Sequence, residues 1–453
     1  MLRNARSLIL GDGMKARVIR GGGLSFFSLA VHNVMRLGSN LILTRLLFPE
    51  AFGLMAIVVV VMSGAAMFSD LGIRGSVIQD DRGEDPDFLA TAWTVQVIRG
   101  VVIWLAVALL ARPISVFYDA PELAVLLPVA GLSALISGAS SINAHVASRN
   151  IRLGRQVMLN IGTYAVSLLV TFALAYAWQS VWALVVGMLV RPVFWMILSH
   201  AIFPGPPPRL ALDRDALSRL FGFGRYIFIA TLATFFVNQG DRAILAKFVS
   251  LGEIAIYNIA YFLAAVPLLI GNSLVGVLHP LYARRPPWES DENRDKIARA
   301  RYGLTAGLLA VVAIMALISV PLVELLYDPR YEAAAPVMTL ITLSLIPQII
   351  TMSYLKLPLA AGHSGRYAIM LLSIALVQLA FLLWGASQAG LVGVALAPAL
   401  TWIVAYPVLA WGIRPYRSHD PLHDALFAGI GVAITALALW LHRDAVMPLF
   451  DVF

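Results

Sequence analysis

Long apolar stretches dominate this chain, and short polar segments separate them. A membrane-spanning helix needs roughly 20 mostly apolar residues, and on that template the sequence predicts thirteen helices. They cover residues 22–44, 52–69, 88–110, 122–145, 156–177, 181–203, 222–246, 253–280, 302–325, 336–360, 367–386, 391–413 and 424–441. Composition agrees, because 13% of the 453 residues are charged, against about 25% in soluble domains. We therefore expect an all-α integral membrane protein.

Basic residues gather on one side of this expected topology. The N-terminal segment and the loops after even-numbered helices hold 22 Arg and Lys residues, whereas the other loops and the C-terminal tail hold five. By the positive-inside rule, the N-terminus and the even loops are cytoplasmic. The formal charge of +8 thus reflects topology, and we expect no nucleic-acid partner.

A proline-rich, charged segment divides the chain into two halves of six helices. Shifting the chain by 202 residues pairs Gly22 with Gly224, Gly38 with Gly240, and Arg45 with Lys247. An even number of spans in each half predicts parallel repeats, as in many alternating-access carriers. The expected parts are a cytosolic amphipathic N-terminal segment (1–21), an N-terminal lobe (22–205), a cytosolic inter-lobe linker (206–221), a C-terminal lobe (222–415), and an extra transmembrane helix with the tail (416–453).

Five cationic side chains fall inside apolar stretches, namely Arg36, Arg99, Arg191, Arg242 and Lys356. A charge at bilayer depth costs at least about 2.5–3.5 kcal/mol, so such residues usually face a wet interior and mark a pathway. Asp241 is the one comparably placed acid in the sequence. This excess of cations predicts an anionic ligand from outside the protein.

Each cation also has a structural interpretation. Lys356 lies near a helix end and can extend to the membrane interface, and Arg242 can pair with the adjacent Asp241. The three mid-helix arginines, Arg36, Arg99 and Arg191, would need backbone carbonyls or amides as partners. Asp241 is a candidate for ion coupling if it does not serve Arg242 alone.

Three polar residues are candidates for contact with sugar. His32 and Asn33 lie four and three residues before Arg36 and so share its helix face, and Gln239 lies in the seventh helix. Each can equally bond between helices. The chain has no cysteine, and nothing in it resembles a catalytic dyad, a metal cluster or a phosphate loop. We therefore expect no enzyme activity, no metal and no cofactor.

Several strings resemble the polysaccharide-transport branch (Wzx-type oligosaccharide flippases) of the multidrug/oligosaccharidyl-lipid/polysaccharide exporter superfamily. The pattern R-L-L-x-P-E-x-F-G matches Arg45–Gly53, and D-L-G-x-x-x-x-x-I-Q matches Asp70–Gln79. An arginine-containing loop after the fourth helix matches Ala147–Arg152. In the second half, Gly240–Phe248 and Gly252–Ala260 are similar to a further signature, although four residues separate Gly252 from Tyr257 where the pattern has one.

The resemblance implies two six-helix lobes around a cationic cavity, and export of lipid-linked sugar repeat units. Arginine can grip the two phosphates of undecaprenyl pyrophosphate bidentately, and lysine can act as a point charge. We therefore expect a multi-pass inner-membrane flippase for exopolysaccharide, capsule or lipopolysaccharide synthesis. Its partners would be a lipid-linked oligosaccharide, membrane lipids, and a polymerase and chain-length regulator of the same pathway.

Three alternatives remain open. A drug/cation antiporter of the same superfamily needs buried carboxylates, and the N-terminal spans contain none away from their ends. A membrane polymerase or ligase typically needs a large outer loop, and the longest outer loops here have about ten residues. A lipid II flippase handles a nearly identical headgroup, and the motifs alone favour the repeat-unit exporter over it.

Overall fold

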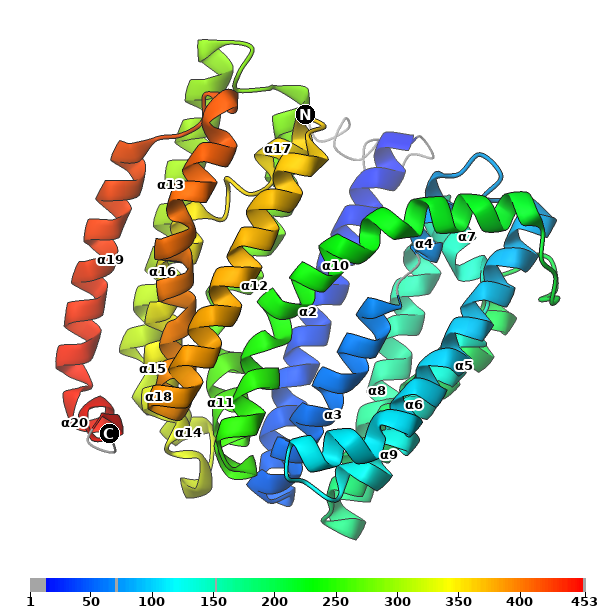
Figure 1. Cartoon of the computed structure of the whole chain (residues 1–453), viewed down its shortest axis with the longest axis horizontal. Coiled ribbons are helices and arrows are strands. Elements are labelled where there is room, and N and C mark those ends of the chain that lie inside the picture. The colour runs from blue at the N-terminus through cyan, green and yellow to red at the C-terminus, as the bar shows by residue number, and fades with distance from the viewer. Residues whose placement is uncertain (1–13, 70–71, 151–152, 451–453) are drawn as a thin grey trace. The chain divides into compact units, whose positions relative to one another are not determined.

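The computed structural model describes residues 14–69, 72–150 and 153–450, which form helices joined by short connections (Figure 1). Within these ranges no residue lies in a strand. Nine of the described helices are long and apolar enough to cross a membrane, or ten if one bent pair is a single span. The expected all-α membrane class is confirmed, whereas the number of thirteen spans stays a prediction.

Parts of three expected features lie outside the described residues. They are the N-terminal segment as far as residue 13, and the motif positions Asp70–Leu71 and Ile151–Arg152.

The chain divides into two compact units, Met1–Thr231 and Leu232–Phe453. The boundary falls inside α10 (Arg214–Phe248), so the expected linker 206–221 groups with the first unit. The other helices of this unit are α2 (Met14–Leu46), α3 (Pro49–Phe68), α4 (Ile73–Gln79), α5 (Pro86–Phe117), α6 (Leu123–Gly138), α7 (Asn143–Arg149), α8 (Leu153–Trp178) and α9 (Val181–Ile202).

Local sequence signals explain where these helices begin. Pro49 and Pro86 occupy first-turn positions of α3 and α5, where a missing N–H costs nothing. Asp85 caps α5, since its carboxylate accepts from the backbone N–H of Asp87 at 2.8 Å and of Phe88 at 3.2 Å. Gly72 precedes α4 with a φ of 64°, a left-handed conformation that glycine adopts without strain.

Small residues let the helices of the first unit approach closely. A Cβ on Gly100 of α5 would lie 2.7 Å from the carbonyl oxygen of Ala134 in α6. On α9, a Cβ on Gly187 would lie 2.0 Å from the Thr171 hydroxyl of α8. Glycine is therefore required at both crossings, as is common between membrane helices.

Two of the family-like strings meet in this unit. Arg149 of α7 donates from one guanidinium nitrogen to the backbone carbonyls of Val77 and Ile78, each at 3.1 Å. These carbonyls lie at the C-terminal end of α4, where the helix leaves acceptors without intrahelical donors. The arginine of the loop after the fourth predicted helix thus caps the short helix after the second.

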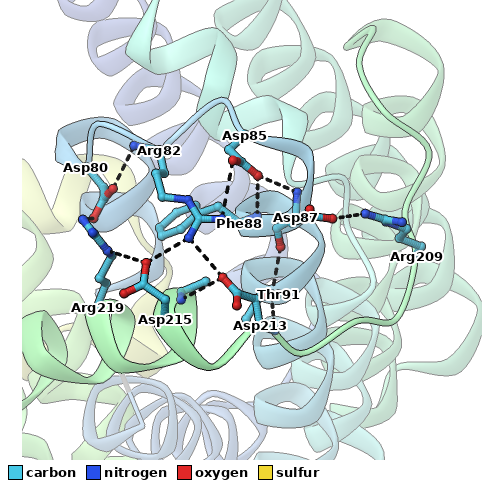
Figure 2. Close-up of polar contacts among 11 residues, drawn as sticks. Asp80, Arg82, Asp85, Asp87, Phe88, Thr91, Arg209, Asp213, Asp215 and Arg219 are labelled. Atoms are coloured by element: carbon cyan, nitrogen blue, oxygen red, sulfur yellow. Dashed lines mark hydrogen bonds and ion pairs between the residues drawn. The ribbon is translucent and has the colours of Figure 1, made fainter.

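An ion-pair network ties the expected linker to the start of α5 (Figure 2). Arg82 donates to Asp213 at 3.1 Å and to Asp215 at 2.9 Å. Arg209 pairs with Asp87, and the backbone N–H of Asp213 donates to the Thr91 hydroxyl at 3.0 Å. These contacts explain why the linker groups with the first unit.

The network lowers the pKa of two carboxyl groups. The pKa of Asp213 is lowered chiefly by the backbone N–H of Ala216, with a further contribution from Arg82. The pKa of Asp85 is lowered by the N–H groups of Phe88 and Asp87 and by Arg82. Both groups hydrogen-bond as carboxylates, which favours the ionised form.

The second unit contains the end of α10 and a group of broken helices. Its elements are α11 (Leu251–Ala264), α12 (Val266–Arg284), α13 (Asp291–Leu317), α14 (Ser319–Leu326), η1 (Pro329–Tyr331), α15 (Ala334–Ser344), α16 (Ile346–Thr351), α17 (Leu357–Ala360), α18 (Ser364–Ile413), η2 (Arg414–Tyr416), α19 (Pro421–Leu441), α20 (Arg443–Val446) and η3 (Met447–Leu449). The span formed by α15 and α16 is 89% buried, against 22–44% for the other candidate spans. It is the centre of this unit, in contact with α11, α13, α18 and α19.

Breaks occur where the sequence provides glycine or proline. Within α18 the helix is interrupted at Ala389 and at Gly390, whose φ is 47°, so one labelled helix covers two of the expected spans. The expected span 336–360 is broken after α16, and residues 352–356 form turns before α17. Pro347 and Pro358 lie in the first turns of α16 and α17, and a proline lacks the N–H that would bond to the preceding turn, which favours a break there.

Candidate functional site

His32 and Arg36 of α2 lie beside Tyr164 of α8. The His32 ring centroid is 4.2 Å from that of Tyr164, and Arg36 lies one turn further along α2 than His32. The Ser39 hydroxyl of α2 donates to the Arg36 carbonyl at 3.0 Å. The candidate sugar ligand His32 therefore packs against Tyr164, one helical turn from the candidate cation Arg36.

Arg191 of α9 joins the same group. Its guanidinium lies 5.3 Å from the centre of the Tyr164 ring, and it donates to the Asn160 side-chain oxygen at 3.4 Å. Arg191 and His32 therefore contact the same Tyr164 ring. The fold thus brings together two cations that are 155 residues apart in the sequence. We call this set of His32, Arg36, Asn160, Tyr164 and Arg191 the cationic cluster.

The helices that carry the cationic cluster contain no acidic residue. Neither Asp nor Glu occurs in the sequences of α2, α8 or α9. A positive charge within apolar helices requires compensation, and these helices supply aromatic rings and amides instead of carboxylates. Such a set of groups can bind an anion through charge-assisted hydrogen bonds.

Arg99 lies on other helices of the same unit. It donates from Nε to the Ser69 hydroxyl at 3.1 Å and from a terminal nitrogen to the Ala66 carbonyl at 2.6 Å. It also lines a cavity of about 440 Å³ formed by α3, α5 and α6 with Met188 of α9. Arg99 therefore caps the end of α3 and also faces a cavity. The first contact fits a structural role, and the second fits a role in binding a ligand.

Arg242 lies in a local polar network of the second unit. Its Nε donates to Asn258 at 2.7 Å, its guanidinium is 3.6 Å from Asp241, and it lies 4.3 Å from the Tyr261 ring centre. The Tyr257 hydroxyl donates to Asp241 at 2.8 Å. These contacts join α10 to α11 and favour the structural interpretation of the Asp241–Arg242 pair.

The remaining expected site residues have separate surroundings. Lys356 lies in the turns between α16 and α17, with its ammonium 5.4 Å from the centre of the Tyr367 ring. Gln239 lies 3.5 Å from Arg242 and belongs to the Asp241 network. Asn33 donates to the Leu29 carbonyl of its own helix at 2.8 Å, a bond typical of an amide that helps to pack a helix.

A family model described as polysaccharide biosynthesis protein matches residues 42–336 of the chain. The chain belongs to this family. The matched region includes Arg99, Arg191 and Arg242, together with the partners Asn160 and Tyr164 of the cationic cluster.

Two curated relatives of the chain are named for succinoglycan transport and for lipopolysaccharide biosynthesis. It is 23% identical over 322 residues to the succinoglycan biosynthesis transport protein ExoT of Rhizobium meliloti, covering 70% of this chain and 64% of the relative. It is 21% identical over 335 residues to the lipopolysaccharide biosynthesis protein WzxC of Escherichia coli, covering 72% of this chain and 67% of the relative. The matches thus span about two thirds of the relatives' length.

A solved structure confirms the fold over nearly the whole chain. The lipid II flippase MurJ, in an inward-closed conformation, matches 94% of this chain and 100% of its own with a TM-score of 0.66 at 14% identity. At that identity the likeness shows the fold alone. The chain is therefore a multi-pass membrane protein that shares the fold of MurJ.

Sequence reasoning missed two members of the cationic cluster. Asn160 and Tyr164 are four residues apart in a predicted span and so lie on one helix face, which was the available signal. They carry no charge, so a search for intramembrane cations passes over them. Their role becomes visible only when α2, α8 and α9 are packed together.

Proposed function

We propose that this protein is a flippase that moves undecaprenyl-pyrophosphate-linked oligosaccharide repeat units across the inner membrane. The names of the ExoT and WzxC relatives support the pathway class, and the fold shared with MurJ supports the type of activity. The observation that carries the proposal is the cationic cluster, where Arg191 and His32 contact the Tyr164 ring, Arg36 lies one turn from His32, and the three helices contain no acid.

In this proposal the cationic cluster holds the pyrophosphate. The planar guanidinium groups of Arg36 and Arg191 suit bidentate bonds to phosphate oxygens. His32 and Asn160 add neutral hydrogen-bonding groups at the same place. Arg99 reaches the substrate from its own cavity, and Lys356 offers a further point charge, whereas Arg242 chiefly serves its local network.

Transport then requires movement without covalent chemistry. The two lobes alternate between inward-open and outward-open states while the headgroup stays bound to the cations. No bond of the substrate is made or broken, so the activity is transport and not catalysis. In this proposal the substrate loads on the cytoplasmic side, where the positive-inside rule predicts the N-terminus and the basic loops, and a polymerase and chain-length regulator act on the exported units.

The antiporter alternative is weakened by the same observation, because α2, α8 and α9 provide no carboxylate to titrate or to bind sodium. The lipid II alternative shares the pyrophosphate chemistry. The identity of the accumulated lipid in a deletion strain separates the two, since a repeat-unit exporter leaves lipid II at its normal level.

Accumulation of the substrate in cells tests the proposal. We expect an Arg36→Gln, Arg191→Gln double variant, produced at the wild-type level, to accumulate the lipid-linked repeat unit in the inner leaflet. Arg112→Gln is the matched control, because Arg112 is an exposed arginine of α5 outside the cationic cluster. Normal polymer export by the double variant would contradict the proposal.

A further inference from the structure

The cavity that Arg99 lines lies beside the cationic cluster. Its volume of about 440 Å³ falls within the range of roughly 300–1,000 Å³ that small-molecule sites occupy. Met188 of α9 forms part of its wall. This residue lies three positions before Arg191 and so shares its helix face, with about 5–6 Å between the Cβ atoms. The cavity and the cationic cluster are therefore neighbours on α9.

Close contact between α5 and α6 shapes this cavity. A Cβ on Gly138 of α6 would lie 2.9 Å from the backbone carbonyl oxygen of Gln96 in α5, so the crossing requires glycine. The side-chain amide of Gln96 donates across it to the carbonyls of Gly138 at 2.9 Å and Ser140 at 3.0 Å. Both amide hydrogens are thus used, and the side-chain oxygen of Gln96 remains as an acceptor in the cavity wall.

Hydroxyl groups add further polar positions to the wall. Ser63 of α3 and Ser137 of α6 both line the cavity, and neither hydroxyl bonds to another of the described residues. Ser133, one turn before Ser137, donates to the Ala130 carbonyl of its own helix at 2.6 Å, which leaves its oxygen able to accept. An unpaired polar group that faces an apolar medium costs free energy. These hydroxyls therefore require water or a polar ligand, and a lipid chain would leave them unpaired.

Arg99 is the charged member of the wall among the described residues. Its guanidinium is held by the Ser69 hydroxyl at 3.1 Å and the Ala66 carbonyl at 2.6 Å. The apolar side chains of Val59 and Ile103 complete the lining. A pyranose ring suits such a wall, because its edge carries hydroxyls and its faces carry C–H groups.

We call this the polar cavity, defined by Ser63, Gln96, Arg99, Ser133 and Ser137.

The chemistry of the proposed substrate requires a sugar site next to the pyrophosphate site. The anomeric carbon of the first sugar is bonded directly to a phosphate oxygen, so the two groups cannot lie far apart. The separation of Met188 and Arg191 by about one helical turn meets this requirement. We propose that the polar cavity binds the hexopyranose attached to the pyrophosphate. This inference rests on the proposed function, because it locates the sugar of the same substrate.

Equilibrium binding to the purified protein in nanodiscs tests the sugar site. The probes are undecaprenyl pyrophosphate alone and the same lipid carrying one glucose or one galactose. Two neutral hydrogen bonds contribute roughly 2- to 10-fold each, so we expect the wild type to bind one of the glycosylated lipids at least about 4-fold more tightly than the bare lipid. Equal affinity for all three lipids overturns the inference.

Two variants separate the sugar site from the pyrophosphate site. Ser137→Leu fills the polar cavity, and we expect it to remove the preference for the glycosylated lipid while binding the bare lipid as the wild type does. The double variant Ser63→Ala, Ser137→Ala keeps the space and loses the hydroxyls, so we expect a reduced preference. Ser218→Leu, at an exposed serine of α10 outside the cavity, is the matched control. The full wild-type preference in either cavity variant overturns the inference.

Cysteine protection distinguishes a failure of this inference from a failure of the proposed function. The chain contains no cysteine, so Ser137→Cys supplies a single thiol at the polar cavity and Ser218→Cys supplies the control. We expect the glycosylated lipid, and the methyl glycoside of the same hexose at high concentration, to slow modification of Ser137→Cys by a small thiol reagent. We expect the bare lipid to leave that rate unchanged.

The possible outcomes then separate. An unchanged rate with the glycosylated lipid overturns the sugar site even if the protein binds pyrophosphate. Protection by the methyl glycoside in a protein that binds no undecaprenyl pyrophosphate contradicts the proposed function and leaves the sugar site standing.

Discussion

Arg82 donates to Asp213 at 3.1 Å across 131 sequence positions. This ion pair fastens the expected inter-lobe linker to the segment before α5, and Figure 2 shows that Asp215 and Asp85 surround the same guanidinium. The N-terminal part of α10 therefore belongs to the first compact unit, while its C-terminal part carries Asp241 and Arg242 in the second.

The linker network predicts a specific pH dependence. The pKa values of Asp213 and Asp85 are lowered in the folded protein from the ordinary value of 3.8. A lowered pKa contributes stability that is present above the ordinary value and is lost as the pH falls through the folded pKa. We expect amide hydrogen exchange at Ala216 and Phe88, corrected for the intrinsic rate, to stay constant from pH 8 to 5 and to rise only below pH 4. Constant protection of these amides down to pH 2 would contradict the claim that the ionised forms of Asp213 and Asp85 stabilise the linker network.

Tyr164 is expected to position the cations of the cationic cluster. Tyr164→Leu removes the ring that faces His32 and Arg191, and a cation–π contact contributes about 0.5–2 kcal/mol. We therefore expect lipid-linked pyrophosphate to bind about 2- to 30-fold more weakly to this variant. Tyr164→Phe keeps the ring, and we expect it to bind nearly as tightly as the wild type. Equal binding by the Leu variant would show that the ring has only a packing role.

Arg242 is expected to act through structure. Arg242→Gln leaves Asp241, which is 5% exposed, without its cation, and breaking a buried pair costs about 3–5 kcal/mol. We expect thermal unfolding at a markedly lower temperature for this variant. The double variant Asp241→Asn, Arg242→Gln is expected to recover part of the loss, as a double-mutant cycle would measure. If Arg242→Gln leaves the unfolding temperature unchanged, the structural role is contradicted, and Arg242 remains a candidate substrate-binding residue.

The orientation in the membrane can be tested with single cysteines, because the chain contains none. The basic loops predict that residues 204–221 and 281–300 face the cytosol. We expect Pro207→Cys and Glu289→Cys in intact cells to resist a membrane-impermeant thiol reagent, and Glu122→Cys to react. Ready labelling of the first two positions would reverse the topology.

Much of the fold follows from hydrophobic patterning, because each stretch of about 20 apolar residues must form a helix in a bilayer. A described helix or broken helix overlaps every one of the expected spans. The site follows less directly. The convergence of His32 and Arg191 on Tyr164 depends on which helices pack together, and apolar faces alone do not specify that order.

Asp424 shows why some of the chemistry could not be predicted. In the sequence it is an acid in the first turn of a helix, where it interacts favourably with the helix dipole. The partners that change this interpretation come from two other segments, at Tyr354 and Tyr406. Arg242 is the opposite case. Its position in the sequence predicted a substrate-binding residue, but its contacts with Asn258 and Asp241 favour a structural role.

The central claim is that Arg36 and Arg191 bind the pyrophosphate of the lipid carrier. The most direct measurement is equilibrium binding of undecaprenyl pyrophosphate to the purified protein in nanodiscs, for the wild type, Arg36→Gln, Arg191→Gln and the control Arg112→Gln. A hydrogen bond to a charged group contributes about 1.5–3 kcal/mol, so we predict a roughly 10- to 150-fold weaker affinity for each cluster variant, partial recovery with lysine, and no change for the control. Wild-type affinity in both cluster variants, with folding intact, would contradict the account.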